Sequence, residues 1–164
     1  MTTDKYVFFF GGVFSQWYQH DMVIADVTYN CAEQYMMAMK AKTFNDTASL
    51  ANIMASDNPS DQKAYGREVK DFNPTIWNLI ARDVVYEANM AKFSGDLKQQ
   101  LLDTGNLEIV EASPTDKIWG IGLGMNNLDI LDKSKWQGTN WLGEAIMAVR
   151  RTIREQDGIT KRQY

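Results

Sequence analysis

The sequence predicts a single α+β domain that is mostly helical and carries a small β-sheet. Long stretches of strong helix formers run without proline or glycine, most clearly over residues 31–44 and 76–93. The β-rich runs are short, and no internal repeat or linker interrupts the 164 residues. We therefore expect one domain over residues 1–164, with its motif-bearing core at 6–153 and a polar C-terminal tail at 154–164.

The N-terminal elements are expected to be strands. Lys5–Phe10 is a β-rich run and predicts a buried strand. Residues 22–24 and 27–29 flank Ala25-Asp26 and predict the two arms of a tight hairpin. Asn30 then stands where an N-cap belongs, immediately before the helix expected over 31–44.

The middle of the chain is expected to be helical. A second helix should run from Asn45-Asp46 to about Ala55, and a third from Pro59 or Ser60 through Gly66. Glycine costs a helix interior about 1 kcal/mol, so Gly66 indicates either a close backbone approach or a helix end. The longest helix should follow Asn73-Pro74-Thr75. Its expected core stripe is Trp77, Ile80, Val84, Ala88 and Ala91.

The C-terminal part predicts a short helix at 97–102 that ends near Gly105, and then a strand at 107–111. Residues 124–138 are polar and predict a loop. A last amphipathic helix should run from Asn140-Trp141 to Ile153, and residues 156–164 are expected to be a frayed polar tail.

Composition narrows the class of protein. Residues 1–82 hold 7 basic and 9 acidic residues and residues 83–164 hold 10 and 12, so each half carries a net charge of −2. No basic lobe therefore indicates long nucleic acids, although basic residues cluster near the C-terminus. No stretch is long and apolar enough to span a bilayer, and no leader is evident, so we expect a cytoplasmic protein without a membrane partner. A single cysteine and a single histidine argue against a disulfide and a structural zinc site, and no cofactor is expected.

Glu33, Met37 and Lys40 recur at i, i+4 and i+7 and should share one helix face. A carboxylate, a thioether and an amine side by side are typical of a pocket wall. Periodicity alone favours a simpler interpretation, in which this face is a boundary between core and surface with a weak salt bridge.

Other catalytic motifs are excluded. Gly120, Gly122 and Gly124 lack the spacing of a dinucleotide-binding fingerprint, and no phosphate-binding loop is present. A serine triad would depend on His20, which is expected in a solvated loop. The remaining chemistry belongs to carboxylates and to lysines whose pKa burial can lower, with Lys40, Lys63 and Lys92 as the candidates.

An ordered set of motifs covers almost the whole chain and resembles the NADAR family, also called YbiA-like. The motifs are Phe14-Ser15-Gln16-Trp17-Tyr18, Ala32-Glu33-Gln34-Tyr35-Met36-Met37 with Lys40-Ala41, Gly66-Arg67, Lys92-Phe93, residues 101–105, residues 111–116, residues 119–122, and Asn140-Trp141-Leu142-Gly143 with Val149-Arg150. Gln16-Trp17 departs from the Asn-Phe expected there. The resemblance implies a YbiA-like fold and N-glycosidase activity, on phosphoribosylaminopyrimidine intermediates of riboflavin synthesis or on ADP-ribosylated guanine.

The residues suit that chemistry. Cleavage of an N-glycosidic bond builds positive charge on the ribose, which a carboxylate stabilises while a second group protonates the leaving nitrogen. Glu33 and Asp116 are the candidates for these roles, and Lys40 is the candidate for attack on the anomeric carbon. The expected substrate-binding residues are Ser15, Trp17, Tyr18, Lys63, Arg67, Glu111, Ser113, Trp119, Asn140 and Trp141.

A second class of function fits the same pocket. A module that binds a nucleotide or ADP-ribose without hydrolysing it would need similar polar residues. The expected partner is a small phosphoribosyl or ADP-ribosyl compound. ADP-ribosylated nucleic acid stays open as a partner, and so do the physiological substrate and the oligomeric state.

Overall fold

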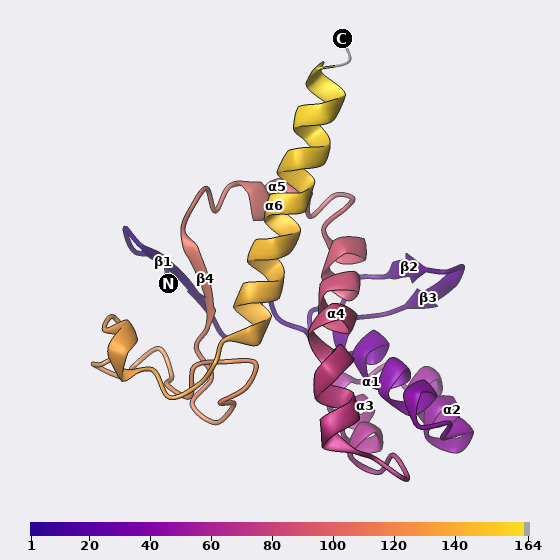
Figure 1. Ribbon diagram of the computed structural model, residues 1–164. Helices are drawn as coiled ribbons and strands as arrows, with labels where there is room; N and C mark the ends of the chain where they lie inside the picture. The colour runs from indigo at the N-terminus through magenta and orange to yellow at the C-terminus, as the bar shows by residue number, and fades with distance from the viewer. Residues whose placement is uncertain (163–164) are drawn as a thin grey trace. The chain divides into compact units, whose positions relative to one another are not determined.

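The computed structural model describes the backbone of residues 1–162 and the side chains of residues 1–158. In chain order the elements are β1 (Tyr6–Phe9), β2 (Met22–Ile24), β3 (Val27–Tyr29), α1 (Ala32–Thr43), α2 (Thr47–Ala55), α3 (Pro59–Arg67), α4 (Pro74–Lys92), α5 (Lys98–Leu102), β4 (Glu108–Glu111), the short 3₁₀ helix η1 (Lys133–Lys135) and α6 (Trp141–Arg162) (Figure 1). The mostly helical α+β class is thereby confirmed. The chain divides into two compact units, Gln16–Lys92 and Met1–Ser15 with Phe93 onward.

In the first unit, α1 packs against α2, α3 and α4. Most of α1 is buried, and the buried residues include the polar side chains of Glu33 and Gln34. Gly66 lets α3 approach α1 closely, because a Cβ there would lie 2.0 Å from the Met37 sulfur. The backbone of α3 thus lies close to the Met37 side chain at Gly66, which is also the penultimate residue of that helix, so both expected reasons for the glycine are observed.

The β2–β3 hairpin has the expected turn, in which Ala25 and Asp26 adopt φ values of 50° and 65°. The expected N-cap at Asn30 is wrong, since Cys31 occupies the cap position and makes no side-chain cap bond. The amide of Asn30 instead accepts a hydrogen bond from Gln62 at 3.1 Å. Gln34 Oε1 accepts from the Asn30 N–H at 2.8 Å, which ties the first turn of α1 to the residue before the cap.

Helix α4 begins where predicted, but its buried face differs from the predicted stripe. Asn73 Oδ1 accepts from the Thr75 N–H at 2.9 Å and from the Ile76 N–H at 3.3 Å. Ile80 and Ala91 are only partly buried. The buried residues are Trp77, Ala81, Val84, Val85, Ala88, Asn89 and Lys92. An amide and an amine therefore lie on the buried face, at positions outside the predicted stripe.

The second unit is built on a parallel pair of strands, β1 and β4, with Phe8 opposite Val110. Both Ile109 and Val110 are fully buried, which shows that both faces of β4 are covered. Helix α6 packs against β4. Phe8 and Val110 belong to a core that also contains Ala112, Ile121, Leu123 and Ile130.

Helix α6 continues to Arg162, so the tail expected to fray after Gln156 is helical up to that residue. Lys98 Nζ lies 2.7 Å from Asp157 Oδ1 and ties this part of α6 to α5. Gly158 does not stop the helix, because a single glycine costs only about 1 kcal/mol. Residues 163–164 lie outside the described part of the chain.

Gly143 is the residue that allows α6 to lie against β4. An added Cβ would stand 2.0 Å from the Ile109 carbonyl oxygen and 2.4 Å from Asn140 Nδ2. We expect Gly143→Ala to lower the free energy of unfolding by about 2 to 3 kcal/mol, since the Ile109 carbonyl belongs to the backbone of β4 and cannot move aside. The measurement is urea unfolding. Gly158→Ala is the control, because its Cβ meets nothing within 4 Å and should be neutral or stabilising. Equal stability of the two variants would contradict the prediction.

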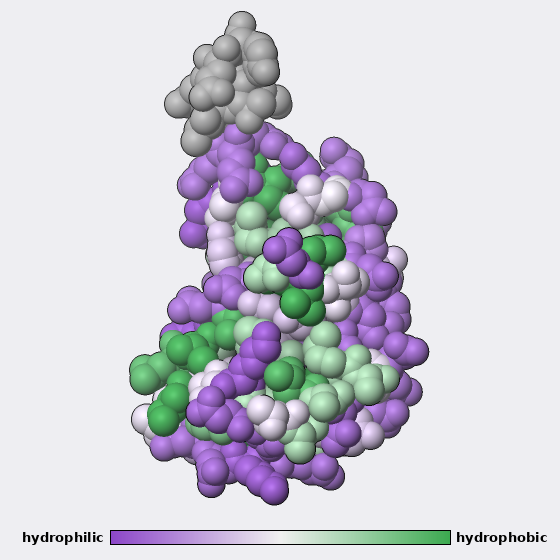
Figure 2. All heavy atoms as spheres, turned by 90° about the vertical axis from the view of Figure 1, so that its right-hand side faces the viewer, coloured by the Kyte–Doolittle hydropathy of each residue, from purple (hydrophilic) through white to green (hydrophobic). Residues whose placement is uncertain are grey.

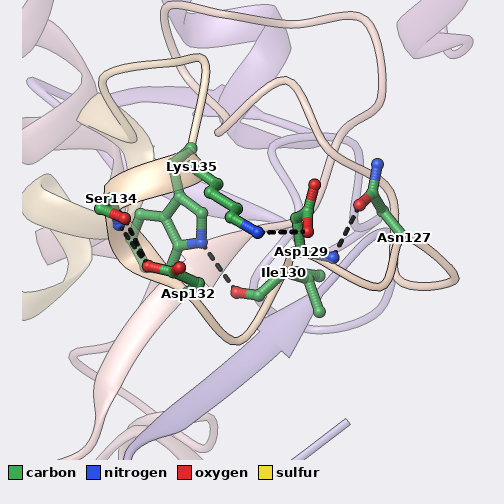
Figure 3. Close-up of polar contacts among 7 residues, drawn as sticks. Asn127, Asp129, Ile130, Asp132, Ser134 and Lys135 are labelled. Atoms are coloured by element: carbon green, nitrogen blue, oxygen red, sulfur yellow. Dashed lines mark hydrogen bonds and ion pairs between the residues drawn. The ribbon is translucent and has the colours of Figure 1, made fainter.

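The long segment before α6 is a loop, as predicted, but polar contacts fix its course (Figure 3). Lys135 Nζ lies 3.1 Å from Asp129 Oδ1, and Asp132 Oδ1 accepts from the Ser134 hydroxyl at 2.6 Å. Trp136 Nε1 donates to the Ile130 carbonyl at 2.8 Å. These bonds hold the loop over the apolar core of its unit.

Hydrophobic side chains also reach the surface. Figure 2 shows several hydrophobic patches within a mainly hydrophilic face. On the β2–β3 hairpin, Val23 and Val27 are exposed. Among the residues that the structure describes, no helix combines the length and apolarity needed to cross a membrane.

Candidate active site

The predicted site residues are divided between the two compact units, and each unit is described separately. Trp17, Tyr18, Glu33, Lys40, Lys63 and Arg67 belong to the first unit. Ser15, Glu111, Ser113, Asp116, Trp119, Asn140 and Trp141 belong to the second.

Helix α1 presents Glu33 and Lys40 within reach of each other's charge. Glu33 is 6% exposed, whereas Lys40 is half-buried with Nζ 4.3 Å from the centre of the Phe72 ring. Burial lowers the pKa of Lys40 from its ordinary value; the Glu33 carboxylate opposes that lowering, and the Arg67 guanidinium adds to it. Glu33, Lys40 and Arg67 therefore form one electrostatic group. Lys63, one turn before Arg67 on α3, is partly buried.

Lys92 is the most deeply buried lysine among the described residues. Its side chain is 1% exposed, and Nζ lies 5.5 Å from the centre of the Tyr18 ring. Burial is the main cause that lowers the pKa of Lys92 to about 7, and the thiol of Cys31 opposes it weakly. At neutral pH a substantial fraction of this amine is therefore unprotonated, the state that a nucleophile requires.

The segment Gln16–Tyr18, which precedes β2, contacts α4. Gln16 is buried and accepts a hydrogen bond from Asn89 Nδ2 at 3.1 Å through its Oε1. Its own carbonyl oxygen accepts from the Glu33 N–H at 2.9 Å. Trp17, the next residue, is 43% exposed and presents its indole to solvent as a stacking surface would.

In the second unit, Asn140 fastens the start of α6 to β4. Its Oδ1 accepts from the Glu111 N–H at 3.1 Å, and its Nδ2 donates to the Ile109 carbonyl at 3.0 Å. Asn140 is 3% exposed and has a φ of 52°, a conformation that asparagine tolerates better than most residues. These bonds give Asn140 a structural task, whereas its predicted contact with substrate remains a prediction.

Ser113 and Asp116 build the turn that follows β4. Ser113 Oγ accepts from the N–H groups of Thr115 at 3.3 Å and Asp116 at 3.0 Å. Asp116 Oδ1 accepts from the N–H groups of Ile118 at 2.9 Å and Trp119 at 2.8 Å. Two backbone N–H groups thus fix the orientation of the Asp116 carboxylate through its Oδ1.

Two tryptophans accompany that turn. The rings of Trp119 and Trp141 meet edge to face, with centroids 5.7 Å apart, and both are partly buried. Ser15, whose N–H donates to the Gly12 carbonyl at 3.0 Å, is also partly buried. The described residues contain no group of three histidine, cysteine, aspartate or glutamate side chains arranged to hold a metal ion.

The sequence indicates little of the part that α4 has in this region. Lys92 is one of three candidate lysines, but the face that Lys40 shares with Glu33 favours Lys40. Asn89 is not among the residues predicted from the sequence. The available signal was a heptad-like spacing, since Val85, Asn89 and Lys92 lie at i, i+4 and i+7 and so share one face.

The chain is similar to a known domain family and to two proteins named N-glycosidases. The model of the NADAR domain family matches residues 8–154. N-glycosidase R617 of Acanthamoeba polyphaga mimivirus is 45% identical, over 92% of this chain and 97% of that protein. N-glycosidase Npun_R5314 of Nostoc punctiforme is 32% identical, over 91% and 90% respectively.

Two further likenesses concern fold and pathway. The NMR structure of the E. coli protein YbiA superimposes with a TM-score of 0.76 and covers 100% of this chain and 91% of that one, at 24% identity. The riboflavin biosynthesis protein PYRR of Zea mays chloroplasts is 28% identical over 87% of this chain but only 23% of its own length.

Proposed function

The chain belongs to the NADAR domain family, and from this premise we propose that it is an N-glycosidase that hydrolyses the bond between a ribose carbon and a base or amine nitrogen. The observation that carries most weight is the 45% identity to a protein named N-glycosidase, of which 97% of the length is covered. A buried carboxylate at Glu33 and lysines with lowered pKa supply the chemistry that such cleavage needs.

Glu33 is the proposed stabiliser of the oxocarbenium-like ribose. A carboxylate in a water-poor environment acts more strongly on a developing positive charge than a solvated one. Asp116 is the proposed general acid, which in its protonated form donates a proton to the leaving nitrogen. Arg67 and Lys63, on one face of α3, are proposed to hold a substrate phosphate.

A lysine supplies an alternative route. Its neutral amine forms a bond to the anomeric carbon while the bond to the base nitrogen breaks, and the leaving base takes up a proton. Opening of the sugar ring then gives an imine, and addition of water returns the free amine and the sugar. Lys40, the candidate expected from the sequence, is one possible nucleophile, and Lys92 is a second, because burial lowers its pKa to about 7.

The proposed substrates are phosphoribosylaminopyrimidine intermediates of riboflavin synthesis and ADP-ribosylated guanine. Similarity to PYRR supports the first. The charge balance of −2 in each half favours a small nucleotide-like compound over a long nucleic acid. The competing function is a module that binds ADP-ribose or a nucleotide without cleaving it.

The test is hydrolysis by the pure protein, followed by mass spectrometry, with one substrate of each kind side by side. Release of ribose 5-phosphate from the pyrimidine intermediate would support the riboflavin-related activity, and release of ADP-ribose from ADP-ribosylated guanosine would support the second. Cleavage of neither, with a raised melting temperature in the presence of one, would refute the glycosidase proposal in favour of the binding module.

A further inference from the structure

Two residues of the segment Gln16–Tyr18 contact one face of α4. Asn89 donates to Gln16 Oε1, and Lys92, one turn further along α4, lies under the Tyr18 ring. Trp17 stands between these two anchors and is the exposed member of the three. The path of the segment is therefore set at two points of a long helix.

The orientation of both amides is fixed by hydrogen bonding. Asn89 Nδ2 also donates to the Val85 carbonyl at 2.8 Å, and a carbonyl oxygen can only accept, so the amide nitrogen must be on that side. Gln16 must then present its oxygen to Asn89, which turns Gln16 Nε2 toward the Met36 sulfur at 3.9 Å. Asn89 Oδ1 is buried and has no hydrogen-bond partner among the described residues.

The same glutamine reaches the start of α1. The first N–H groups of a helix lack partners within it, and the Cys31 side chain makes no cap bond here. The Glu33 N–H is satisfied by the carbonyl of Gln16 instead. Gln16 thus connects α4 to the backbone of the residue whose carboxylate we assign to the ribose.

We infer that Gln16 and Asn89 are positioning residues, which fix Glu33 and Trp17 relative to α4. The inference rests on the proposed function. A buried amide pair with one unsatisfied oxygen is a costly way to fill a core, because two apolar side chains of the same size would avoid the desolvation. What the amides provide is a directed bond, and a directed bond fixes a position.

The test compares Gln16→Met, Asn89→Leu and the double variant. Each single variant leaves one buried amide without its partner and should lower the melting temperature by several degrees. The double variant replaces both amides with apolar groups of similar size and should regain most of that stability. We expect its kcat to stay at least tenfold below that of the wild type, with KM changed less than threefold. A double variant with wild-type kcat would overturn the inference, since a merely structural pair would recover activity with stability.

A second readout does not depend on activity. Hydrogen exchange of the Glu33 amide reports the bond to the Gln16 carbonyl, and the double variant should exchange it at least tenfold faster. Unchanged exchange would overturn the inference, even if the wild type cleaves neither substrate and the proposed function itself fails. Asn78→Leu, on an exposed position of α4, is the matched control and should leave both measurements unchanged.

Discussion

Lys92→Met is expected to stabilise the fold and, by the imine route through Lys92, to abolish hydrolysis. The side chain is 1% exposed, and burial lowers its pKa from 10.5 to about 7. That difference corresponds to at most about 5 kcal/mol of penalty on the charged form. Methionine fills a similar volume without a charge, so the penalty disappears together with the amine.

The pH dependence of stability follows from the same pKa. Between pH 7 and 10.5 the unfolded chain binds a proton at Lys92 that the folded chain does not, so stability rises with pH in this window. The advantage of Lys92→Met should therefore be greatest below pH 7 and fade toward pH 10. Urea unfolding at pH 6 and pH 9 measures it, with the exposed Lys42→Met as control. An advantage that does not change with pH would contradict this account.

Two measurements on the reaction distinguish Lys92 from Lys40 as the nucleophile. If Lys92 attacks the anomeric carbon, kcat/KM should fall tenfold for each pH unit below about 7, and borohydride should trap the sugar on the peptide that contains Lys92. Trapping on the peptide that contains Lys40 would transfer the role to α1. Full activity in both Lys92→Met and Lys40→Ala would eliminate the imine route.

Glu33→Gln is expected to lower kcat by roughly 10² to 10⁴, with a smaller change in KM. The substitution keeps the shape and the N–H bond to Gln16 but removes the negative charge from a side chain that is 6% exposed. The loss should appear in kcat because the charge acts on the cation that develops in the transition state.

The charge of Glu33 also has a readout outside catalysis. Because this carboxylate raises the pKa of Lys40, its removal should lower that pKa further, which an NMR titration of labelled lysine can follow. Glu68→Gln, an exposed carboxamide substitution just after α3, is the control. A Lys40 pKa that does not respond would contradict the proximity, and unchanged kcat would exclude Glu33 from the reaction.

Local chemistry determined most of the elements. The turn at Ala25-Asp26, the start of α2 after Asp46 and the start of α3 at Pro59 all depend on residues within a few positions of each other. Such features can be predicted, because hydrogen bonding and backbone preference act over that distance. The motifs that indicate the family are likewise sequence features, and they correctly predicted the YbiA-like fold.

Tertiary contacts decided the rest. The cap at Cys31 replaced the one expected at Asn30, because the Asn30 amide is engaged by Gln62, 32 residues away. Helix α6 extends beyond its predicted end at Ile153, and Lys98 of α5 forms an ion pair with Asp157 in this additional part. Pairing of β1 with β4 joins segments about 100 residues apart, for which neither strand carries a local signal.

The sequence by itself determined the fold family and placed Glu33 and Lys40 together on one helix, because a helical period of 3.6 residues fixes which side chains share a face. Only the tertiary structure singled out Lys92 and the Gln16–Asn89 pair. A lysine pKa and an amide bond of this kind depend on how completely neighbouring elements exclude water, and burial is a property of the packed chain rather than of any stretch of it.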